Sequence, residues 1–380
     1  MQIRAITVGF NVAISRITAG IKKHARFLAL AKKVFEDYGY EVQTTRVASQ
    51  PWPEYLSDFS ARDIIAHVKS LELLCSENNI DFLSVGTAYE PSHIQLVAQV
   101  LESTVRVSCS ATIADKKRGF AYDATLSAAR AIMKIAKAVG NGEGNFRFAA
   151  IANCPPDIPF FPASYHRGRN CFMIALEGGD LIAKAFSAAR DFSSAEKNLA
   201  SVMYGEYRKI EKIAKRIEKQ ERLFFRGIDV SPAPSTLRKG SIAFAFERLG
   251  WGEFGTPGTL AIARMITRVL RSIKVRQCGF SGLMLPVMED FGLARRINNL
   301  NIDTLLVYSA VCGTGLDCVP LPGDVRVSKI CNILYDVAAL ALHLNKPLSA
   351  RLLPMPGRRA GSWTNIDSPY LINCRIPPIK

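Results

Sequence analysis

Residues 308–324 read YSAVCGTGLDCVPLPGD, an apolar segment that passes into a stretch rich in glycine, proline, thiol and carboxylate. We expect a buried strand over residues 302–309 and a loop after it, because glycine permits unusual backbone angles and proline stiffens the chain. Side chains that bind or react in α/β proteins gather in loops at the carboxyl ends of strands. The stretch therefore predicts an α/β fold with a site at this loop, or else a connector whose cysteines only pack.

Strand-like and helix-like segments alternate on both sides of this stretch. The chain opens with an alternating strand pattern over residues 1–8, and apolar residues recur at helical spacing from Ile21 onward. Residues 40–47 again have the pattern of a strand, and a helix is expected over 325–344. Such alternation favours a largely parallel sheet. Because no compositional linker divides the chain, we expect one large α/β barrel domain over residues 1–380.

A long amphipathic helix is expected near residues 195–222. Tyr207, Ile210, Ala214 and Ile217 form one narrow apolar stripe, and the remaining positions mix glutamates with lysines and arginines. A segment that binds nucleic acid seldom contains so many glutamates. The charged positions therefore indicate a solvated helix face.

The chain carries an excess of positive charge, with 49 Lys and Arg against 33 Asp and Glu and a formal net charge of +16. This excess favours an anionic partner. The sequence has no zinc-finger, helix-turn-helix or RNA-binding motif, and its aromatic residues do not interleave with basic ones as a base-stacking surface requires. We therefore expect a small anionic molecule rather than nucleic acid. An RNA scaffold, the alternative, would bind in a strongly salt-dependent way.

Nine cysteines are scattered along the chain without a C-x-x-C pair, which disfavours a disulfide framework and a structural zinc site. The first residues have a strand pattern rather than that of a secretion signal, and no apolar run is long enough to cross a membrane. These features predict a cytoplasmic protein without a membrane partner. Phe224 and Phe225 are expected to be exposed, which favours a homo-oligomer.

Several long motifs carry a resemblance to a known family. They are FSGLMLPVMED at residues 280–290, the stretch 308–324, NKPLSARLLPMPG at 345–357, FFPASYH at 160–166 and GIDVSPAPS at 227–235. Together they resemble domain-of-unknown-function family 711, which is related to uncharacterised protein family 0210. The resemblance covers nearly the whole chain. It implies a fold similar to the ten-stranded α/β barrel of the pyruvate formate-lyase-like glycyl radical enzymes, and it implies no established reaction.

Glycyl radical enzymes carry a glycine in an Arg-Val-Ser/Gly-Gly-Tyr type of segment near the C-terminus, and cysteines on a loop inside the barrel. Residues 357–365 of this chain read GRRAGSWTN and do not match that segment. Cys312 is the candidate for the inner loop. We therefore expect the barrel without the glycyl radical.

Cys312 and His166 are candidates for nucleophilic or acid-base chemistry. A thiol nucleophile needs a depressed pKa and a base within hydrogen-bonding reach. His166 is set among prolines and aromatic residues, whereas the other four histidines fall in helical patterns. Tyr165 beside it would donate a hydrogen bond to a ligand or anchor the loop.

Carboxylates give a second set of candidates, since Asp229, Glu289, Asp317 and Asp324 all lie near expected strand ends. They suit acid-base work or an oxygen-coordinated divalent cation, although an acidic residue at a helix start is equally a cap. No pair of histidines with a carboxylate has the spacing of a transition-metal site. Cofactor and metal otherwise stay unassigned.

Arginines and exposed backbone N–H groups near the C-terminal motifs suit a phosphate or a carboxylate. Our leading hypothesis is an enzyme that acts on a small anionic metabolite in the mouth of the barrel, with Arg351 as the anion clamp. A sensor that binds an amino acid or carboxylate without converting it is the alternative. The catalytic candidates are Cys312, Asp317, Asp229 and His166, and the binding candidates are Arg351, Gly313, Gly315, Thr314, Tyr165, Glu289, Asp324 and Arg358.

Overall fold

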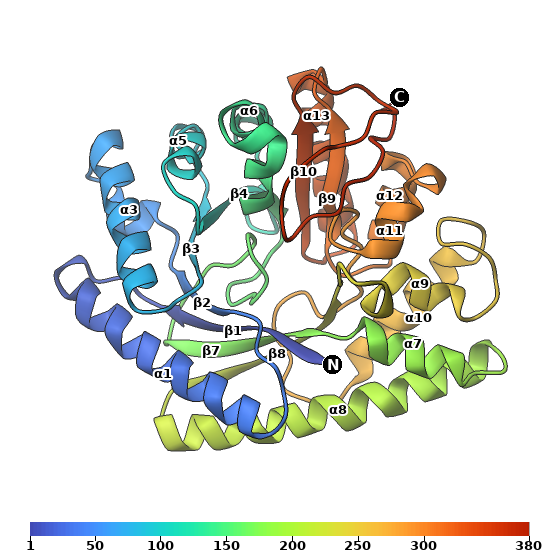
Figure 1. Ribbon diagram of the computed structural model, residues 1–380. Coiled ribbons are helices and arrows are strands. Elements are labelled where there is room, and N and C mark those ends of the chain that lie inside the picture. The colour runs from blue at the N-terminus through green and yellow to red at the C-terminus, as the bar shows by residue number, and fades with distance from the viewer. Residues whose placement is uncertain (380) are drawn as a thin grey trace.

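The computed structural model describes residues 1–379 and contains one ten-stranded sheet. Nine strands follow one another side by side in the order β8-β7-β1-β2-β3-β4-β6-β10-β9, and the short β5 (Gly119–Phe120) pairs with β4 alone. The sheet is strongly curved, and helices cover its outer face (Figure 1). The strands are β1 (Gln2–Phe10), β2 (Thr45–Ser49), β3 (Phe82–Ala88), β4 (Val107–Asp115), β6 (Phe148–Ala152), β7 (Cys171–Glu177), β8 (Phe224–Ala233), β9 (Gly315–Pro322) and β10 (Leu348–Met355).

The sheet has two halves that run in opposite directions. Strands β1, β2, β3, β4 and β6 are parallel to one another. β7 pairs antiparallel with β1, and β10 pairs antiparallel with β6, while β8 and β9 continue parallel to these two strands. The expected largely parallel sheet is confirmed, and the two antiparallel pairings are where the halves join.

Residues 277–287 lie between the two edge strands and link them. Gln277 forms an isolated parallel bridge with Ile228 of β8, and Pro286 forms another with Asp317 of β9. The segment therefore occupies the gap between β8 and β9 without becoming a regular strand. Its two bridges bring the edges of the curved sheet together as a barrel, although continuous hydrogen bonding does not close it.

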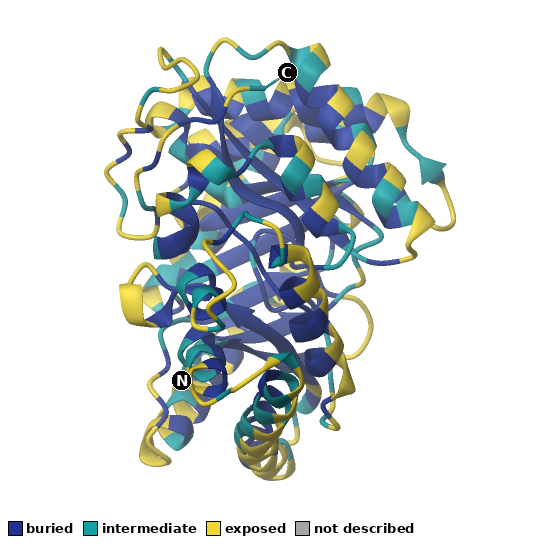
Figure 2. Ribbon diagram, turned by 90° about the vertical axis from the view of Figure 1, so that its right-hand side faces the viewer, coloured by how far each residue is buried: buried dark blue, intermediate teal, exposed yellow. Residues whose placement is uncertain are grey.

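The helices pack their apolar faces on the outside of the sheet, so that the strands are buried and the outer helix faces are exposed (Figure 2). Helix α8 (Phe192–Glu221) begins at a capping box formed by Asp191 and Ser194, and its buried side includes the expected stripe with Tyr207 and Ile217. The other helices are α1 (Ile17–Asp37), α2 (Pro53–Leu56), α3 (Ala61–Glu77), α4 (Pro91–Ile94), α5 (Val97–Glu102), α6 (Tyr122–Ala138), α7 (Gly179–Ser187), α9 (Ile242–Glu247), α10 (Thr259–Ser272), α11 (Phe291–Arg295), α12 (Ile302–Ser309) and α13 (Val327–His343).

No helix within residues 1–379 is both long enough and apolar enough to span a bilayer.

Three expectations about local structure are wrong. Residues 302–309 form helix α12, capped by the Asn301 side chain, rather than a strand, because a short apolar run fits either structure. The glycine- and proline-rich stretch after it is largely strand β9 rather than a loop. Phe225 is fully buried and Phe224 is partly covered by arginines, so the expected exposed apolar pair does not exist. The homo-oligomer stays a prediction without this support.

A long loop, residues 153–170 between β6 and β7, enters the barrel. Phe160 and Tyr165 pack there with side chains of the inner sheet face, in a core cluster separate from the one under the helices. The Thr7 hydroxyl donates to the Pro159 carbonyl at 3.3 Å, and Ser84 donates to the Ser164 carbonyl at 2.6 Å. This loop, rather than the segment with Cys312, is therefore the inner loop of the barrel.

The segment that links the edge strands touches the turn before β9 at two glycines. A Cβ atom on Gly282 would lie 2.7 Å from the Gly313 Cα atom, and a Cβ on Gly313 would lie 2.7 Å from the Gly282 backbone. The Gly313 N–H donates to the Leu283 carbonyl at 2.7 Å. Because backbone meets backbone, only glycine fits at both positions.

Replacing Gly313 by alanine is therefore expected to lower the free energy of unfolding by about 1–3 kcal/mol, because the added methyl group forces the two segments apart. Gly20, inside α1, is a matched control, since a Cβ there meets nothing within 4 Å. Gly20→Ala should raise stability by about 0.5–1 kcal/mol. Urea unfolding followed by circular dichroism measures both, and equal stability of Gly313→Ala and wild type would contradict the closure described above.

Candidate functional site

A cavity of about 610 Å³ lies inside the barrel. The amino ends of β1, β2, β3, β4 and β6 form one wall. The rest comes from residues of β7, β9 and β10, the end of β8 and the turn after it, the residues before β6, the segment 280–289, the inner loop and the C-terminal segment. We expected a site at the carboxyl ends of parallel strands. This cavity lies at the amino ends of the five parallel strands, and it also meets the carboxyl ends of β7 and β8, which are parallel to each other.

Arg351 is the centre of a buried ion-pair network on the cavity wall. Its Nε donates to Asp317 Oδ1 at 2.7 Å, and its Nη2 donates to Glu289. The second oxygen of Glu289 accepts from Arg4 Nη2 at 3.3 Å. The network joins β10, β9, β1 and Glu289, which lies just after the linking segment, and it neutralises the Arg351 guanidinium.

A β-bulge creates this convergence. Arg351 on β10 faces two residues of β9, Asp317 and Cys318, because the register shifts between Ala350 and Leu352. Cys318 has a left-handed backbone with φ of 45°, and its thiol donates to Glu289 at 3.2 Å. The bulge therefore turns both side chains toward the same arginine.

Burial and charge act in opposite directions on these groups. Burial raises the pKa of the Asp317 carboxyl. Burial acts the same way on Glu289, but the charges of Arg351 and Arg4 outweigh it and lower the pKa of Glu289. Burial disfavours the charged guanidinium of Arg351, but Asp317 and the other acidic neighbours outweigh it and raise its pKa. Of the two carboxyls, only Asp317 has a raised pKa, so burial favours its protonated form.

Arg46 is a second arginine on the cavity wall, and it has no carboxylate within ion-pair distance among residues 1–379. Its Nε donates to the Thr44 hydroxyl at 2.9 Å. The guanidinium lies over the rings of Phe161 and Phe82, at 5.1 and 5.6 Å from their centroids. Burial, followed by the charge of Arg4, lowers the pKa of Arg46 to about 9, as expected for a cation that lacks a counter-charge.

Two hydroxyl groups on the cavity wall are buried without a hydrogen-bond partner in the described part of the chain. They belong to Ser108, at the amino end of β4, and to Thr314, just before β9. Buried polar groups in native proteins are nearly always satisfied by protein, water or ligand. These two hydroxyls therefore retain unused hydrogen-bonding capacity next to the cavity.

Aromatic rings line part of the cavity. Phe146 stacks on Tyr370 with centroids 5.8 Å apart and ring planes 7° apart, and the Arg351 guanidinium lies 5.0 Å from the Phe146 centroid. Tyr370 belongs to the C-terminal segment, which thereby forms part of the wall. The cavity combines apolar surface with a few placed polar groups, as small-molecule sites commonly do.

The structure brings four of the candidates expected from sequence to the cavity and leaves the others elsewhere. Asp317, Glu289, Thr314 and Arg351 all line it. Cys312 does not, because its side chain is buried in the hydrophobic core at the end of α12.

Asp229 is buried but does not line the cavity. Its carboxylate accepts hydrogen bonds from a serine hydroxyl and from backbone N–H groups. The Ser231 hydroxyl donates to it at 2.6 Å, and the backbone N–H groups of Phe280 and Ser281 donate at 2.7 and 2.9 Å. Burial raises its pKa to about 6 against these bonds. Its contacts hold the linking segment against β8, which is a structural role.

The remaining candidates also lie away from the cavity. Asp324 and Arg358 are exposed on loops beyond β9 and β10. The Tyr165 hydroxyl donates to the Cys154 carbonyl at 2.8 Å within the inner loop. Gly313 and Gly315 serve close backbone contacts, the first with Gly282 and the second with β10. His166 belongs to a different group of side chains, at the other end of the barrel.

Sequence reasoning missed Arg46, and a signal for it existed. Arg4, Arg46, Arg106 and Arg147 each lie at or next to the first residues of one of the parallel strands. Amino ends of parallel strands meet at one edge of a sheet, so a repeated arginine in this position indicates a basic rim.

These features define an α/β barrel protein with an arginine-lined interior cavity. The family described as Uncharacterised ACR (DUF711) matches residues 1–367, and the chain belongs to this family, as the sequence motifs indicated.

Relatives align over nearly the full length of this chain. A UPF0210 protein of Pyrobaculum arsenaticum is 27% identical over 401 aligned residues, which cover 97% of this chain and 88% of that protein. The UPF0210 protein of Methanopyrus kandleri is 24% identical and covers 95% and 87%. That of Carboxydothermus hydrogenoformans is 26% identical and covers 96% and 87%.

A solved structure of an anaerobic ribonucleotide reductase resembles this chain over most of its length. It aligns with 92% of this chain and 70% of its own, with a TM-score of 0.43 and 7% sequence identity. At this level of similarity, nothing about fold relationship or activity follows from it.

Replacing Arg351 by methionine should lower the free energy of unfolding by about 3–5 kcal/mol at pH 7, because Asp317 is left buried without a counter-charge and Glu289 keeps only Arg4. Without Arg351, the Asp317 carboxyl binds a proton more readily in the folded than in the unfolded chain. The loss of stability should therefore shrink as the pH falls toward 5. Urea unfolding at the two pH values measures this.

Arg296→Met is the matched control, since Arg296 also binds two carboxylates, Glu247 and Glu253, but near the surface. It should cost less than about 1 kcal/mol. A similar, pH-independent loss in both variants would show that the buried network does not have the role assigned to it.

Proposed function

We propose that this protein is an enzyme that acts on a small anionic metabolite in the barrel cavity, and that Arg46 binds the anionic group. The observation that carries the proposal is the half-buried Arg46 guanidinium, which lines the cavity and lacks a carboxylate partner among the described residues. Ser108 and Thr314 supply free hydroxyls on the same wall. A cation and unsatisfied hydroxyls in a largely enclosed space suit a bound carboxylate or phosphate.

The anion clamp in this proposal is Arg46 rather than Arg351. Arg351 already donates to Asp317 and Glu289, so its charge is compensated within the protein. An arginine in this state positions its carboxylates. It has little electrostatic attraction left for a ligand.

The charge of the lining favours a single negative charge on the ligand. The cavity has an excess of one positive charge, and its aromatic walls suit an apolar body. We therefore place a carboxylate with an apolar or aromatic part ahead of a phosphate. The charged residues that line the cavity are Arg4, Arg46, Arg106, Arg147, Arg351, Glu143, Glu177, Glu289 and Asp317.

Asp317 is the candidate acid or base of the reaction, because it lines the cavity and burial raises its pKa. Cys312, Asp229 and His166 are given no chemical role here, since they lie outside the cavity. A ligand sensor is the rival function. It is favoured by the engagement of Asp317 and Glu289 with Arg351, which leaves neither carboxylate free.

Arg46→Met should abolish or weaken anion binding by at least about tenfold, because a charge-assisted hydrogen bond contributes about 1.5–3 kcal/mol. We would measure thermal shifts with benzoate, an apolar monoanion, and with inorganic phosphate. Benzoate should stabilise the wild type and not Arg46→Met. Arg295→Met is the matched control, since exposed Arg295 also lies over an aromatic ring, that of Phe291, at 5.3 Å.

Metabolite extracts incubated with wild type, Arg46→Met and Arg295→Met, followed by mass spectrometry, separate the two functions. Consumption of an anionic compound by wild type and Arg295→Met alone supports the enzyme. Retention of an unchanged anion supports the sensor. Binding and consumption that are the same in Arg46→Met as in wild type would overturn the proposed site.

A further inference from the structure

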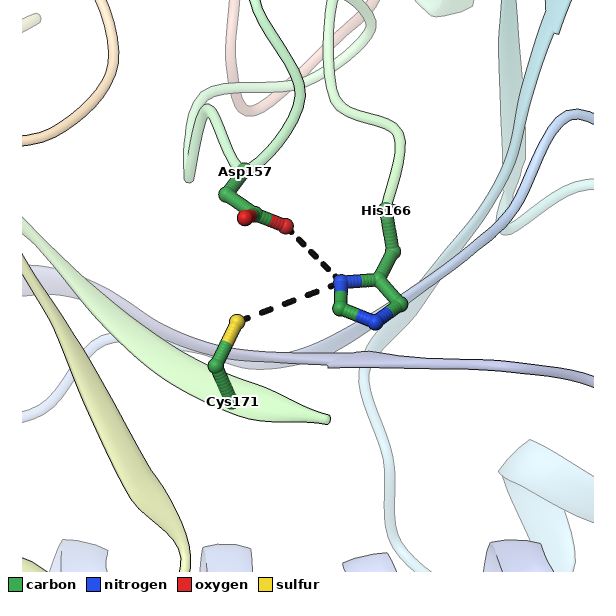
Figure 3. A group of neighbouring side chains, drawn as sticks. All are labelled: Asp157, His166 and Cys171. Carbon is green, nitrogen blue, oxygen red and sulfur yellow. Dashed lines mark hydrogen bonds and ion pairs between the residues drawn. The ribbon is translucent and has the colours of Figure 1, made fainter. Parts of the chain in front are cut away.

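A second group of chemically active side chains lies at the opposite end of the barrel from the cavity. Asp157 and His166 come from the inner loop, and Cys171 is the first residue of β7 (Figure 3). His166 and Cys171 are 0% exposed and Asp157 is 4% exposed. The His166 backbone N–H donates to the Ser49 carbonyl at 2.8 Å, which places the group at the carboxyl ends of β1 and β2.

The three side chains converge on one point. His166 Nδ1 lies 2.8 Å from Asp157 Oδ1 and 3.9 Å from Cys171 Sγ, and the three atoms all lie within 4.8 Å of one another. Ligand atoms around a tetrahedral zinc ion are separated by about 3.3–3.8 Å, as bond lengths of about 2.0 and 2.3 Å require. The group therefore needs only a small opening between Asp157 and His166 to hold an ion.

Neighbouring groups orient the side chains as they would orient metal ligands. His166 Nε2 lies 3.2 Å from the Gly168 carbonyl; in the tautomer with its proton on Nε2, this nitrogen donates to that carbonyl and the lone pair of Nδ1 faces the group. Arg226 Nε donates to Asp157 Oδ2 at 3.1 Å, which leaves Oδ1 for the group. Both supporting contacts are of the kind that fix histidine and carboxylate ligands.

In this tautomer two acceptor atoms face each other. His166 Nδ1 and Asp157 Oδ1 lie 2.8 Å apart, so a cation or a proton must lie between them. A proton would make an imidazolium–carboxylate pair and would give Cys171 no role. A metal ion uses all three atoms.

The backbone leaves room for this arrangement at Gly9 of β1. A Cβ atom there would lie 2.6 Å from His166 Nδ1 and 3.4 Å from Asp157 Oδ1. Asp157 itself has a left-handed backbone, with φ of 66°, and is held by its N–H donating to the Tyr165 carbonyl at 2.7 Å. Any side chain at position 9 would therefore displace the imidazole from the group.

We propose that Asp157 Oδ1, His166 Nδ1 and Cys171 Sγ bind one Zn²⁺ ion and leave its fourth position to water. Thiolate with imidazole favours zinc over magnesium or calcium. Binding releases the thiol proton of Cys171 to solvent, because the thiolate is the ligand. The ligands lie 9 and 5 residues apart in sequence. This wide spacing, with one histidine, is why the sequence showed no transition-metal pattern.

The test uses the full chain, purified without chelator and analysed for zinc by mass spectrometry. The metal is then removed, and Co²⁺ is added to detect a sulfur-to-cobalt charge-transfer band. The wild type should hold about one zinc per chain and show the band. Cys171→Ser and Asp157→Asn should each lose at least about tenfold in affinity. Cys109→Ser, a buried cysteine in β4, is the matched control and should bind as the wild type does.

A wild type that holds no zinc and shows no sulfur-to-cobalt band would overturn the proposal, whatever the variants do. A band that persists unchanged in folded Cys171→Ser would also overturn it, because the thiolate would then lie elsewhere. Circular dichroism identifies variants that fail to fold, and the second substitution decides in that case. None of these results depends on the cavity at the other end of the barrel, so the two proposals stand or fall separately.

Discussion

The buried ion pairs of Arg351 are the interaction on which the rest of the structure depends. They join β10, β9, β1 and Glu289, which lies just after the segment that links the sheet edges, and these parts are far apart in sequence. A buried ion pair adds little stability compared with well-packed apolar side chains, but breaking one leaves an uncompensated charge and is costly. We therefore infer that the network acts mainly through specificity, by fixing how β10, β9 and β1 meet.

The ion pairs of Arg351 also determine which arginine can attract a ligand. Because Arg351 is neutralised from within, it holds Asp317 at the cavity wall instead of attracting an anion. Arg46 lies between two aromatic rings without a counter-charge, so its positive charge is directed to the cavity. The inner loop separates this cavity from the group formed by Asp157, His166 and Cys171 at the opposite end. One barrel thus offers two chemically different environments.

Much of the architecture could be predicted from periodicity. The alternation of strands and helices, the parallel majority of the sheet and the buried stripe of α8 follow from side-chain patterns that local geometry dictates. The assignment of residues 302–309 failed because a short segment with a central apolar run suits a buried strand or a short helix equally well. β9 was taken for a loop because its glycines and prolines obscure the strand pattern, and the bulge opposite Arg351 is where that pattern breaks.

The sequence by itself determined the family, the α/β class and the excess of positive charge, because motifs, periodicity and composition are local or additive properties. Only the tertiary structure decided which charged side chains are compensated. The sequence points to Arg351 rather than Arg46 as the anion clamp, and to Cys312 rather than Cys171 as the reactive thiol. Their roles depend on which neighbours the folded chain places within hydrogen-bonding distance, and partners in this network lie up to 285 residues apart in the sequence.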